Sequence, residues 1–383
     1  MTHRRSYALF SAQYPPHLGG IENFTQGLAK ALVEMGNDVT VVTNDTEKLG
    51  EGLVIEDGVN VLRLPCIPLV SGRFPVPLVN RRCRRLLKGL ESTRFDGVLV
   101  NARFYIHSLI GMRLARKMGL RPVVLDHGSA WLTFSNPALD PLVRFYECAI
   151  TTYGKRNKAA YYGISQKSAD WLATFGIQAE GVIPNAIDAE EYCRCASGRD
   201  FRSELELSDD AFIVAFAGRL IPEKGVKTVI EASEDQALKS KHVVFVLAGD
   251  GPMSDEVREA QGESLKWVGR LCKMDTAALF NQANVMCLPS RSEGFSTTLL
   301  EASACGCPSI VTDVGGAREL IPNGNFGTII PDMSSSSLVG AVLSLLGDRK
   351  RLMCQAKNVR ERCASYSKRA LAEKCVQAFE RAC

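Results

Sequence analysis

Short apolar runs alternate along the chain with segments in which apolar residues recur at helical spacing. The runs in the first half predict strands at 7–12, 39–43, 59–64, 98–101 and 123–126. Helix-period segments separate most of these strands, and further helices are expected at about 141–158 and 166–175. Such alternation is typical of βαβ units and of parallel sheets.

The alternation begins again after a short strand and turn at 181–188, which predicts a hinge between two domains. The second half predicts strands at 212–217, 243–248, 265–268, 285–288 and 309–311. The fold class is therefore α/β, with two Rossmann-like, doubly wound domains facing a central cleft. We place the first domain at 1–187 and the second at 188–365, and we expect a C-terminal helix, 366–383, to return to the first domain.

The composition is that of a soluble globular protein, with 46% hydrophobic and 23% charged residues. No apolar run reaches about 18 residues, so no transmembrane helix is predicted. The first ten residues predict a strand and not a secretory signal. The 13 cysteines lack regular spacing, and we interpret them as reduced packing residues of a cytosolic protein.

The charge is distributed unevenly along the chain. Residues 1–187 contain 22 Lys and Arg against 15 Asp and Glu, a net charge of +7. The remaining residues contain 24 against 27, a net charge of −3, and the two values sum to the +4 of the whole chain. The basic first half indicates that this half faces an anionic partner.

Two glutamates, Glu293 and Glu301, lie on either side of a predicted helix start. Ser296 or Thr297 is placed to cap this helix, and Gly294 predicts a turn before it. Glu293 would then lie in the loop and Glu301 about one turn into the helix. Two hydrogen-bond acceptors would bracket a helix N-terminus, where a phosphate is stabilised. A nucleotide sugar, with hydroxyl groups at both ends and a diphosphate between them, fits this pattern.

Loops that follow predicted strands supply candidate phosphate-binding groups. Arg219 and Lys224 lie in the loop 218–225, and an arginine fork and a lysine point charge both suit phosphate. The turn at 249–252 follows the next strand, and 315–319 forms another glycine turn into a helix. Neither a dehydrogenase glycine fingerprint nor a P-loop lysine follows the first strand, which argues against those two classes.

Motifs of one family occur here in order: Gly19-Gly20 with Glu22, Gly218-Arg219 with Glu223-Lys224-Gly225, Gly249-Asp250-Gly251-Pro252, and Glu293-Gly294-Phe295 with Glu301. As a set they resemble the retaining glycosyltransferase family 4, of GT-B architecture, and the resemblance covers nearly the whole chain. The segment 184–188 is similar to the family's interdomain segment, with Ala186 where glycine is common.

The resemblance implies transfer of a hexose-type sugar from a nucleotide-diphosphate sugar, expected to be UDP-linked, with retained anomeric configuration. The acceptor would be a glycan or a lipid-linked, for example polyprenyl-linked, molecule of cell-envelope or polysaccharide synthesis. The residues implied in catalysis are Arg219, Lys224, Glu293 and His127. The residues implied in donor binding are Gly19, Gly20, Gly218, Asp250, Gly294, Phe295, Ser296, Thr297 and Glu301.

Charge that builds on the departing diphosphate is best stabilised by preorganised cations and helix amides. No Asp-x-Asp motif lies near these loops, so we expect Arg219 and Lys224 to supply the countercharge without a metal or cofactor. A retaining glycosidase uses two carboxylates about 5 Å apart, one of them a nucleophile. We interpret Glu293 and Glu301 instead as donor-binding groups, and we expect front-face attack assisted by the leaving phosphate.

The acceptor is expected on the first domain, near Glu22 and the loop 129–140 with Trp131 and Phe134. A basic helix is predicted in the same domain, and it would carry Leu78, Val79, Leu86 and Leu87 with Arg81, Arg82, Arg84, Arg85 and Lys88. Basic amphipathic helices bind anionic membrane surfaces. The expected location is therefore cytoplasmic, with peripheral association at the inner face of the plasma membrane.

Other interpretations stay open. A nucleotide-sugar epimerase would share this architecture, and an inactive homologue would bind a partner or lipid without catalysis. The joint presence of Arg219, Lys224, Glu293 and Glu301 counts against the inactive homologue. Nucleic-acid binding is disfavoured, because no aromatic stacking platform accompanies the basic residues.

Overall fold

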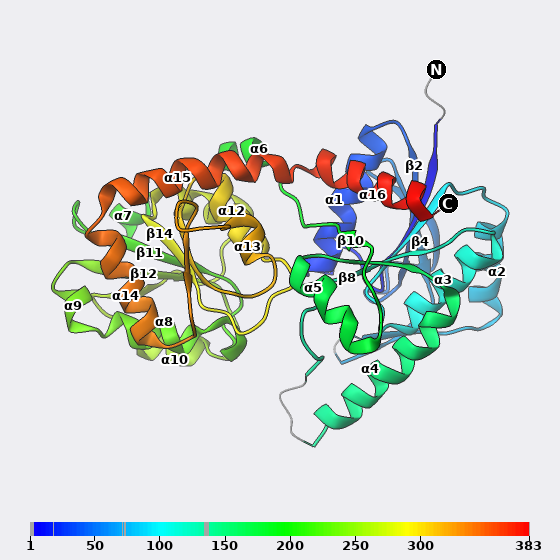
Figure 1. The fold of residues 1–383 in the computed structure, drawn as a ribbon, viewed down its shortest axis with the longest axis horizontal. Helices are drawn as coiled ribbons and strands as arrows, with labels where there is room; N and C mark the ends of the chain where they lie inside the picture. Colours follow the sequence, from blue (N-terminus) through cyan, green and yellow to red (C-terminus); the bar gives the residue numbers. More distant parts are fainter. Residues whose placement is uncertain (1–3, 18, 71, 73, 134–137, 383) are drawn as a thin grey trace. The chain divides into compact units, whose positions relative to one another are not determined.

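The computed structural model describes residues 4–17, 19–70, 72, 74–133 and 138–382. The chain divides into two compact units (Figure 1). Unit 1 comprises Met1–Ala186 and Lys368–Cys383, and unit 2 comprises Ile187–Ser367. The C-terminal helix therefore belongs to unit 1, as expected from the sequence.

Unit 1 is built on an eight-stranded sheet with the strand order β10-β9-β8-β7-β1-β2-β4-β3. Its strands are β1 (Ser6–Phe10), β2 (Asp38–Asn44), β3 (Gly52–Glu56), β4 (Val59–Leu64), β7 (Gly97–Asn101), β8 (Val123–Asp126), β9 (Ala160–Gly163) and β10 (Gly181–Val182). All neighbours pair in parallel except β3, which runs antiparallel to β4 at the edge. A separate antiparallel pair joins β5 (Cys66–Leu69) and β6 (Phe74–Pro77).

Helices cover both faces of this sheet. They are α1 (Gly20–Glu34), α2 (Arg81–Glu91), α3 (Ile106–Lys117), α4 (Asp140–Gly154), α5 (Gln166–Trp171) and α16 (Lys368–Ala382), with 3-10 turns η1 (Lys155–Asn157) and η2 (Leu172–Phe175). Tyr7 of β1 stacks on Phe379 of α16, with ring centroids 4.9 Å apart. Phe10, three residues further along β1, contacts His107 of α3 at 5.6 Å. Residues three apart on a strand point to opposite faces, so α3 and α16 bury the two sides of β1.

Two features of unit 1 differ from the sequence prediction. The edge strand β3 and the β5–β6 pair were not predicted. The predicted helix that carries Leu78 and Val79 begins only at Arg81, and Asn80 caps it by accepting from the backbone N–H of Cys83 at 2.9 Å. Leu78 and Val79 therefore lie ahead of the helix and are exposed.

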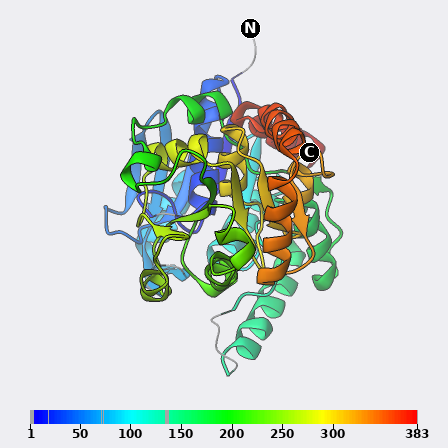
Figure 2. The same cartoon turned by 90° about the vertical axis from the view of Figure 1, so that its left-hand side faces the viewer.

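Unit 2 contains a six-stranded, all-parallel sheet with the order β13-β12-β11-β14-β15-β16. Its strands are β11 (Phe212–Ala217), β12 (Val243–Ala248), β13 (Leu265–Trp267), β14 (Val285–Leu288), β15 (Ser309–Thr312) and β16 (Thr328–Ile330). Its helices are α6 (Ala189–Arg194), α7 (Phe201–Glu204), α8 (Val226–Ser233), α9 (Gln236–Lys239), α10 (Ser254–Glu259), α11 (Lys273–Gln282), α12 (Thr297–Ala304), α13 (Ala317–Leu320), α14 (Ser335–Leu346) and α15 (Arg349–Cys363), with η3 (Pro222–Lys224) and η4 (Ala364–Tyr366). The crossovers through α8 and α12 run in opposite directions along the sheet. Because such crossovers are right-handed, these helices lie on opposite faces (Figure 2).

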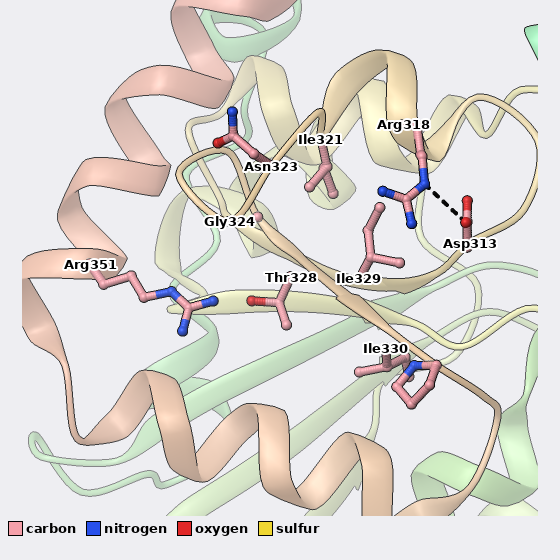
Figure 3. A pocket seen from close by; sticks show the side chains of 11 residues that line it. Asp313, Arg318, Ile321, Asn323, Gly324, Thr328, Ile329, Ile330 and Arg351 are labelled. Carbon is pink, nitrogen blue, oxygen red and sulfur yellow. Dashed lines mark hydrogen bonds and ion pairs between the residues drawn. The ribbon is translucent and has the colours of Figure 1, made fainter.

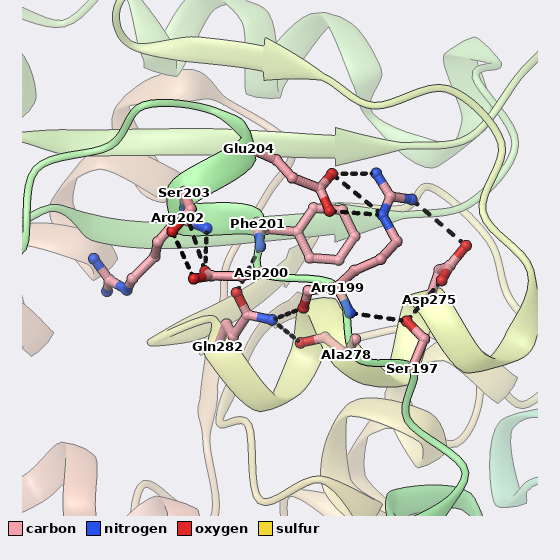
Figure 4. Close-up of polar contacts among 10 residues, drawn as sticks. All are labelled: Ser197, Arg199, Asp200, Phe201, Arg202, Ser203, Glu204, Asp275, Ala278 and Gln282. Carbon is pink, nitrogen blue, oxygen red and sulfur yellow. Dashed lines mark hydrogen bonds and ion pairs between the residues drawn. The ribbon is translucent and has the colours of Figure 1, made fainter.

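A polar cluster fastens the first segment of unit 2 to helix α11 (Figure 4). Arg199 forms ion pairs with Glu204 at 2.6 Å and with Asp275 of α11 at 3.5 Å. Gln282, at the end of α11, donates to the carbonyl of Arg199 at 2.8 Å and accepts from the backbone N–H of Phe201 at 2.8 Å. These contacts hold the chain in place just before β11.

Across the part of the chain described above, no helix combines the length and the apolar character needed to cross a bilayer.

Candidate active site

The loops that follow β11 and β12 are joined backbone to backbone. The N–H of Leu220 donates to the carbonyl of Asp250 at 2.9 Å, and the N–H of Gly218 donates to that of Ala248 at 3.0 Å. Gly249 has a φ of +150°, and a Cβ there would lie 1.8 Å from the carbonyl oxygen of Gly218. Only glycine permits this approach. The joined loops present Arg219 to solvent at the carboxyl end of the sheet.

Asp250 was predicted to bind the donor, and the structure places its exposed carboxylate in this turn. Its Oδ1 accepts from the backbone N–H of Gly251 at 2.7 Å and from the hydroxyl of Ser254 at 2.8 Å. These two hydrogen bonds lower the pKa of Asp250, the Ser254 bond contributing more. The carboxylate is therefore ionised at neutral pH and shapes the turn that leads into α10.

Lys224 and Glu293, both predicted to be catalytic, form an ion pair with an Nζ–Oε1 distance of 2.6 Å. Their side chains are 25% and 12% exposed, so solvent screens the pair only in part. The hydroxyl of Ser290 donates to the same Oε1 at 2.7 Å. The N–H of Arg291 donates to the carbonyl of Glu223 at 2.8 Å, which ties the two loops together at the backbone.

Beyond Glu293 the chain enters α12 as predicted. Ser296 is the N-cap and accepts from the N–H of Leu299 at 3.2 Å, and Thr297 is the first helical residue. Phe295, which follows the turn at Gly294, is buried and packs near Tyr366 with ring centroids 5.7 Å apart. This packing fixes the position of the helix N-terminus.

Glu301 lies in the second turn of α12, as the sequence predicted. Burial raises its pKa to about 7, and the positive charge of Lys273 at the start of α11 opposes that rise. A carboxyl group with this pKa changes between neutral and charged forms near physiological pH. Hydrogen bonds donated by a ligand would therefore change the ionised fraction of Glu301.

In unit 1, Glu22 lies buried in the first turn of α1. Its Oε1 is 3.1 Å from Nδ1 of His17, and Nε2 of His17 is 3.0 Å from Nε2 of Gln13. A Cβ at Gly19 would lie 2.2 Å from Oε2 of Glu22, so a larger residue there would displace the carboxylate. Gly20 begins α1 and has open space around it. The sequence did not single out His17, although it lies two residues before Gly19-Gly20.

His127 follows directly after β8. Its Nε2 is 2.8 Å from Oδ1 of Asn101, and its ring meets that of Phe24 edge-on at 5.1 Å. Burial lowers the pKa of His127 to about 3, so the imidazole is neutral at physiological pH. Asn101 ends β7, the strand next to β8, and its place at a strand's carboxyl end is the signal that could have identified it.

A buried ionic cluster includes Asp126, the residue before His127. Arg103, Asp126 and Glu147 are 2%, 0% and 1% exposed. Arg103 Nη1 donates to Asp126 Oδ1 at 2.9 Å, and its Nη2 donates to Glu147 Oε1 at 2.5 Å. Burial raises the pKa of Asp126 to about 6 although Arg103 lowers it. Glu147 also accepts from the N–H of Leu132 at 3.2 Å, so the cluster joins β8, α4 and the loop after β8.

Trp131, predicted to contact the acceptor, packs within unit 1. Its ring meets Trp171 at 5.2 Å and Phe175 at 5.3 Å, both edge-on, and the guanidinium of Arg144 lies 5.7 Å from its centroid. The second predicted contact of this loop, Phe134, lies outside the described residues.

Helix α2 presents its cations outward and its apolar side inward. Arg81, Arg82, Arg84, Arg85 and Lys88 are all exposed. Cys83 and Leu90 are buried, and Leu86 and Leu87 pack against the same core. The apolar side of α2 is thus occupied by unit 1 itself.

A pocket of about 500 Å³ lies along the edge strand β16 of unit 2 (Figure 3). Arg318, which pairs with Asp313 at 2.9 Å, lines it together with Asn323, Thr328 and Arg351. Arg318 belongs to the predicted glycine turn 315–319, but none of the residues predicted in catalysis or donor binding lines this pocket.

The sequence matches two family models, "Glycosyltransferase Family 4" over residues 18–191 and "Glycosyl transferases group 1" over residues 198–369. It is 26% identical to an alpha-D-kanosaminyltransferase of Streptomyces kanamyceticus, over 86% of this chain and 92% of that protein. It is 24% identical to a GDP-mannose-dependent alpha-(1-6)-phosphatidylinositol monomannoside mannosyltransferase of Mycolicibacterium smegmatis, over 90% of each.

Among solved structures, the chain is similar to a sucrose-phosphate synthase from Thermosynechococcus elongatus, with a TM-score of 0.77, 22% identity and 99% of both chains covered. It is also similar to HepE of Anabaena in complex with UDP, with a TM-score of 0.74 and 17% identity over 99% of this chain and 100% of that one. These similarities establish the fold.

Proposed function

Because the chain belongs to the family-4 and group-1 glycosyltransferases and has the GT-B fold, we propose that it transfers a hexose-type sugar with retention. The donor is a nucleoside diphosphate sugar, expected to be UDP-linked. The acceptor is a glycan or lipid-linked molecule of cell-envelope or polysaccharide synthesis. The observation that carries this proposal is the Lys224–Glu293 ion pair, held at the carboxyl end of the unit 2 sheet beside the N-terminus of α12.

The Lys224–Glu293 ion pair suits a site that binds an anionic ligand. In the ligand-free protein, Glu293 neutralises Lys224. A diphosphate that reached Lys224 would compete for its ammonium group and release Glu293 to accept hydrogen bonds from sugar hydroxyls. As the glycosidic bond breaks, negative charge grows on the β-phosphate, where Lys224 and Arg219 stabilise it. No metal or cofactor is required by this scheme, because the two cations provide the countercharge.

Glu301 is proposed to bind the ribose of the donor. The ribose hydroxyl groups donate to a carboxylate, and such bonds favour its ionised form. The raised pKa of Glu301, about 7, means that ribose binding and ionisation are coupled near neutral pH. Glu293 is paired with a cation, and we assign it to donor binding and not to nucleophilic attack. Retention would then follow from front-face attack assisted by the leaving phosphate.

The acceptor is proposed to be presented at an anionic membrane surface. Unit 1 exposes aliphatic side chains on β3, on β5 and ahead of α2, namely Leu53, Val54, Ile55, Ile67, Leu69, Leu78 and Val79. Ile55 is 75% exposed. Arg82 of α2 pairs with Glu51, just before β3, at 2.6 Å, so the basic helix adjoins this aliphatic strand. Aliphatic insertion with flanking cations, each contributing ~1 kcal/mol, suits peripheral binding at the inner face of the plasma membrane.

A donor screen tests the enzymatic proposal. Thermal shift with UDP-, GDP- and ADP-sugars should identify one stabilising donor, since a ligand at 100 times its Kd stabilises by ~2.7 kcal/mol. Labelled donor should then be transferred to a lipid-linked or glycan acceptor with retained configuration. Isomerised sugar nucleotide in the absence of acceptor would indicate an epimerase instead. A protein that no nucleotide sugar stabilises would fit the inactive-homologue interpretation.

A charge-matched comparison tests the membrane proposal. Replacing Arg81, Arg82, Arg84 and Arg85 with glutamine should abolish binding to vesicles that contain anionic lipid. The control removes four exposed cations of unit 2 by the same substitution at Lys227, Lys241, Lys350 and Lys357. Equal loss in both variants would show that net charge alone matters, and unchanged binding of the α2 variant would refute the assignment.

A further inference from the structure

Hydrogen-bond directions define the chemistry of Asn101. The hydroxyl of Thr25 lies 2.7 Å from the carbonyl oxygen of Ile21, which can only accept, so the single hydroxyl proton of Thr25 points there. Thr25 Oγ1 is therefore an acceptor toward Asn101, whose Nδ2 lies 3.1 Å away. Oδ1 of Asn101 then faces His127, and a carbonyl oxygen can only accept. Nε2 of His127, 2.8 Å from this oxygen, must carry the ring proton.

Burial keeps water from competing for the hydrogen bonds between Thr25, Asn101 and His127. Thr25 and Asn101 are buried, and so is Ser11, which lies 3.3 Å from the Thr25 hydroxyl. Burial also keeps the His127 ring neutral, because it lowers the pKa to about 3. A neutral imidazole with a proton on Nε2 has a lone pair on Nδ1. Among the described residues, Nδ1 of His127 has no hydrogen-bond partner, and His127 as a whole residue is partly exposed.

We propose that Asn101 is a positioning residue that holds His127 as the Nε2–H tautomer, so that Nδ1 accepts a hydrogen bond from a substrate sugar hydroxyl. This inference rests on the proposed glycosyl transfer. A neutral hydrogen-bond acceptor such as Nδ1 is suitable here, because the anomeric centre of the donor sugar becomes positively charged in the transition state. A protonated imidazolium would repel that charge, whereas a neutral nitrogen acceptor fixes the sugar without opposing it.

The tautomer is measured on the ligand-free full-length protein. Two-bond 1H–15N correlation spectra of 15N-histidine-labelled protein, assigned with the His127→Gln variant, should show the Nε2–H form of His127 with no protonation above pH 5. Asn101→Asp places a carboxylate beside Nε2 and should stabilise the imidazolium, so the ring should titrate at higher pH. An Nδ1–H tautomer in the wild type, or an unchanged titration in Asn101→Asp, would overturn the assignment to Asn101.

A matched variant separates positioning from general destabilisation. Asn44 is also buried, ends strand β2 of the same sheet, and donates from Nδ2 to the carbonyl of Ala12 at 2.7 Å. Asn44→Asp buries a carboxylate in the same unit but should leave the His127 tautomer and the pH profile of kcat unchanged. Asn101→Asp should lower kcat about 10- to 100-fold, shift its pH profile and change the donor KM less than threefold. Equal pH profiles in the two variants would indicate a merely structural role for Asn101.

Deoxy substrates identify the hydroxyl partner. Donor sugars and acceptors that each lack one hydroxyl are tested with wild type and His127→Gln. The analogue without the partner hydroxyl should make the two enzymes equally slow, and it shows whether donor or acceptor supplies the group. If His127→Gln slowed the reaction by the same factor with every analogue, the proposal that Nδ1 of His127 accepts from one sugar hydroxyl would be wrong. If the tautomer is as stated but no sugar nucleotide binds or reacts, the proposed function is wrong, and so is the sugar hydroxyl as the partner of Nδ1. The assignment of Asn101 as the residue that sets the His127 tautomer would still be correct.

Discussion

The two units prepare their ligand-facing groups in opposite ways. In unit 2, Arg219 is exposed and Lys224 shares an accessible ion pair with Glu293. In unit 1, His127 is neutral and follows directly after Asp126, a member of a buried ionic cluster. Unit 2 therefore offers charges that a ligand can recruit, whereas unit 1 offers a hydrogen-bonding group whose direction is already set.

This difference matches the chemistry assigned to each unit. A departing diphosphate needs cations that interact more strongly as charge develops. A sugar hydroxyl is uncharged, so its recognition depends on the placement of hydrogen-bond donors and acceptors. The comparison predicts that variants in unit 1 act mainly by changing the stability of the fold and the hydrogen-bond geometry of His127. Variants in unit 2 should act mainly by changing donor binding and the stabilisation of the departing diphosphate.

The largest effect on stability is expected at Arg103. Arg103→Met leaves Asp126 and Glu147 buried without their shared cation, which should lower the free energy of unfolding by about 3–5 kcal/mol. Chemical denaturation followed by circular dichroism measures the change. The triple variant with Asp126→Asn and Glu147→Gln as well removes the orphaned charges and should recover part of the loss. A change below about 1 kcal/mol in Arg103→Met would contradict the buried-cluster interpretation.

The largest effect on catalysis is expected at Lys224. Lys224→Met removes a cation from the departing diphosphate and should lower kcat/KM by about 10²–10³-fold. Steady-state transfer assays measure this loss. Lys227→Met is the matched control, because Lys227 lies on the exposed side of α8 and pairs with Glu231 only at 3.8 Å. Activity of Lys224→Met within about threefold of the control would remove Lys224 from the proposed mechanism.

Glu301 should make nucleotide binding depend on pH. If ribose hydroxyls need the ionised carboxylate, affinity should fall about tenfold per pH unit below about 7 and stay constant above it. Stability follows the opposite trend. The pKa of Glu301 in the folded protein, about 7, exceeds the ordinary glutamate pKa of 4.5, so the stability that Glu301 contributes falls as pH rises between these values. Calorimetry and thermal unfolding at several pH values check both trends. Glu301→Gln should remove them, and a pH dependence that persists in this variant must arise elsewhere.

Sequence patterns predicted the buried parts of the fold well, because central parallel strands are continuous apolar runs. The predicted bounds of β8, β11, β12 and β14 coincide with the structure. The edge strand β3 was missed because its exposed residues carry no burial pattern. The signal for it was Asp57-Gly58, both at positive φ, in the two-residue turn that joins β3 to β4.

The site was predictable where a motif places charge on a loop after a strand. Glu293, Ser296 and Glu301 lie in the loop, at the N-cap and in the helix, as the sequence predicted. The pairing of Glu293 with Lys224 was not predicted, because the two residues are 69 positions apart and only the strand order brings them together. Arg103 was missed for a similar reason, since a buried arginine is recognised only by its carboxylate partners.

The smallest effect is expected at Asp250, and it separates a turn residue from a donor ligand. Asp250→Asn keeps an oxygen that can accept from Gly251 and Ser254, so the free energy of unfolding should stay close to that of the wild type. If the carboxylate also binds the donor, the donor KM should rise about threefold while kcat stays unchanged, because such a contact would be equal in ground and transition states. Ser254→Ala removes a turn hydrogen bond but keeps the carboxylate, and it should lower stability without raising KM. A donor KM that is the same in both variants and in wild type would show that Asp250 only stabilises the turn. The charged groups that bind the donor would then be Arg219 and Lys224.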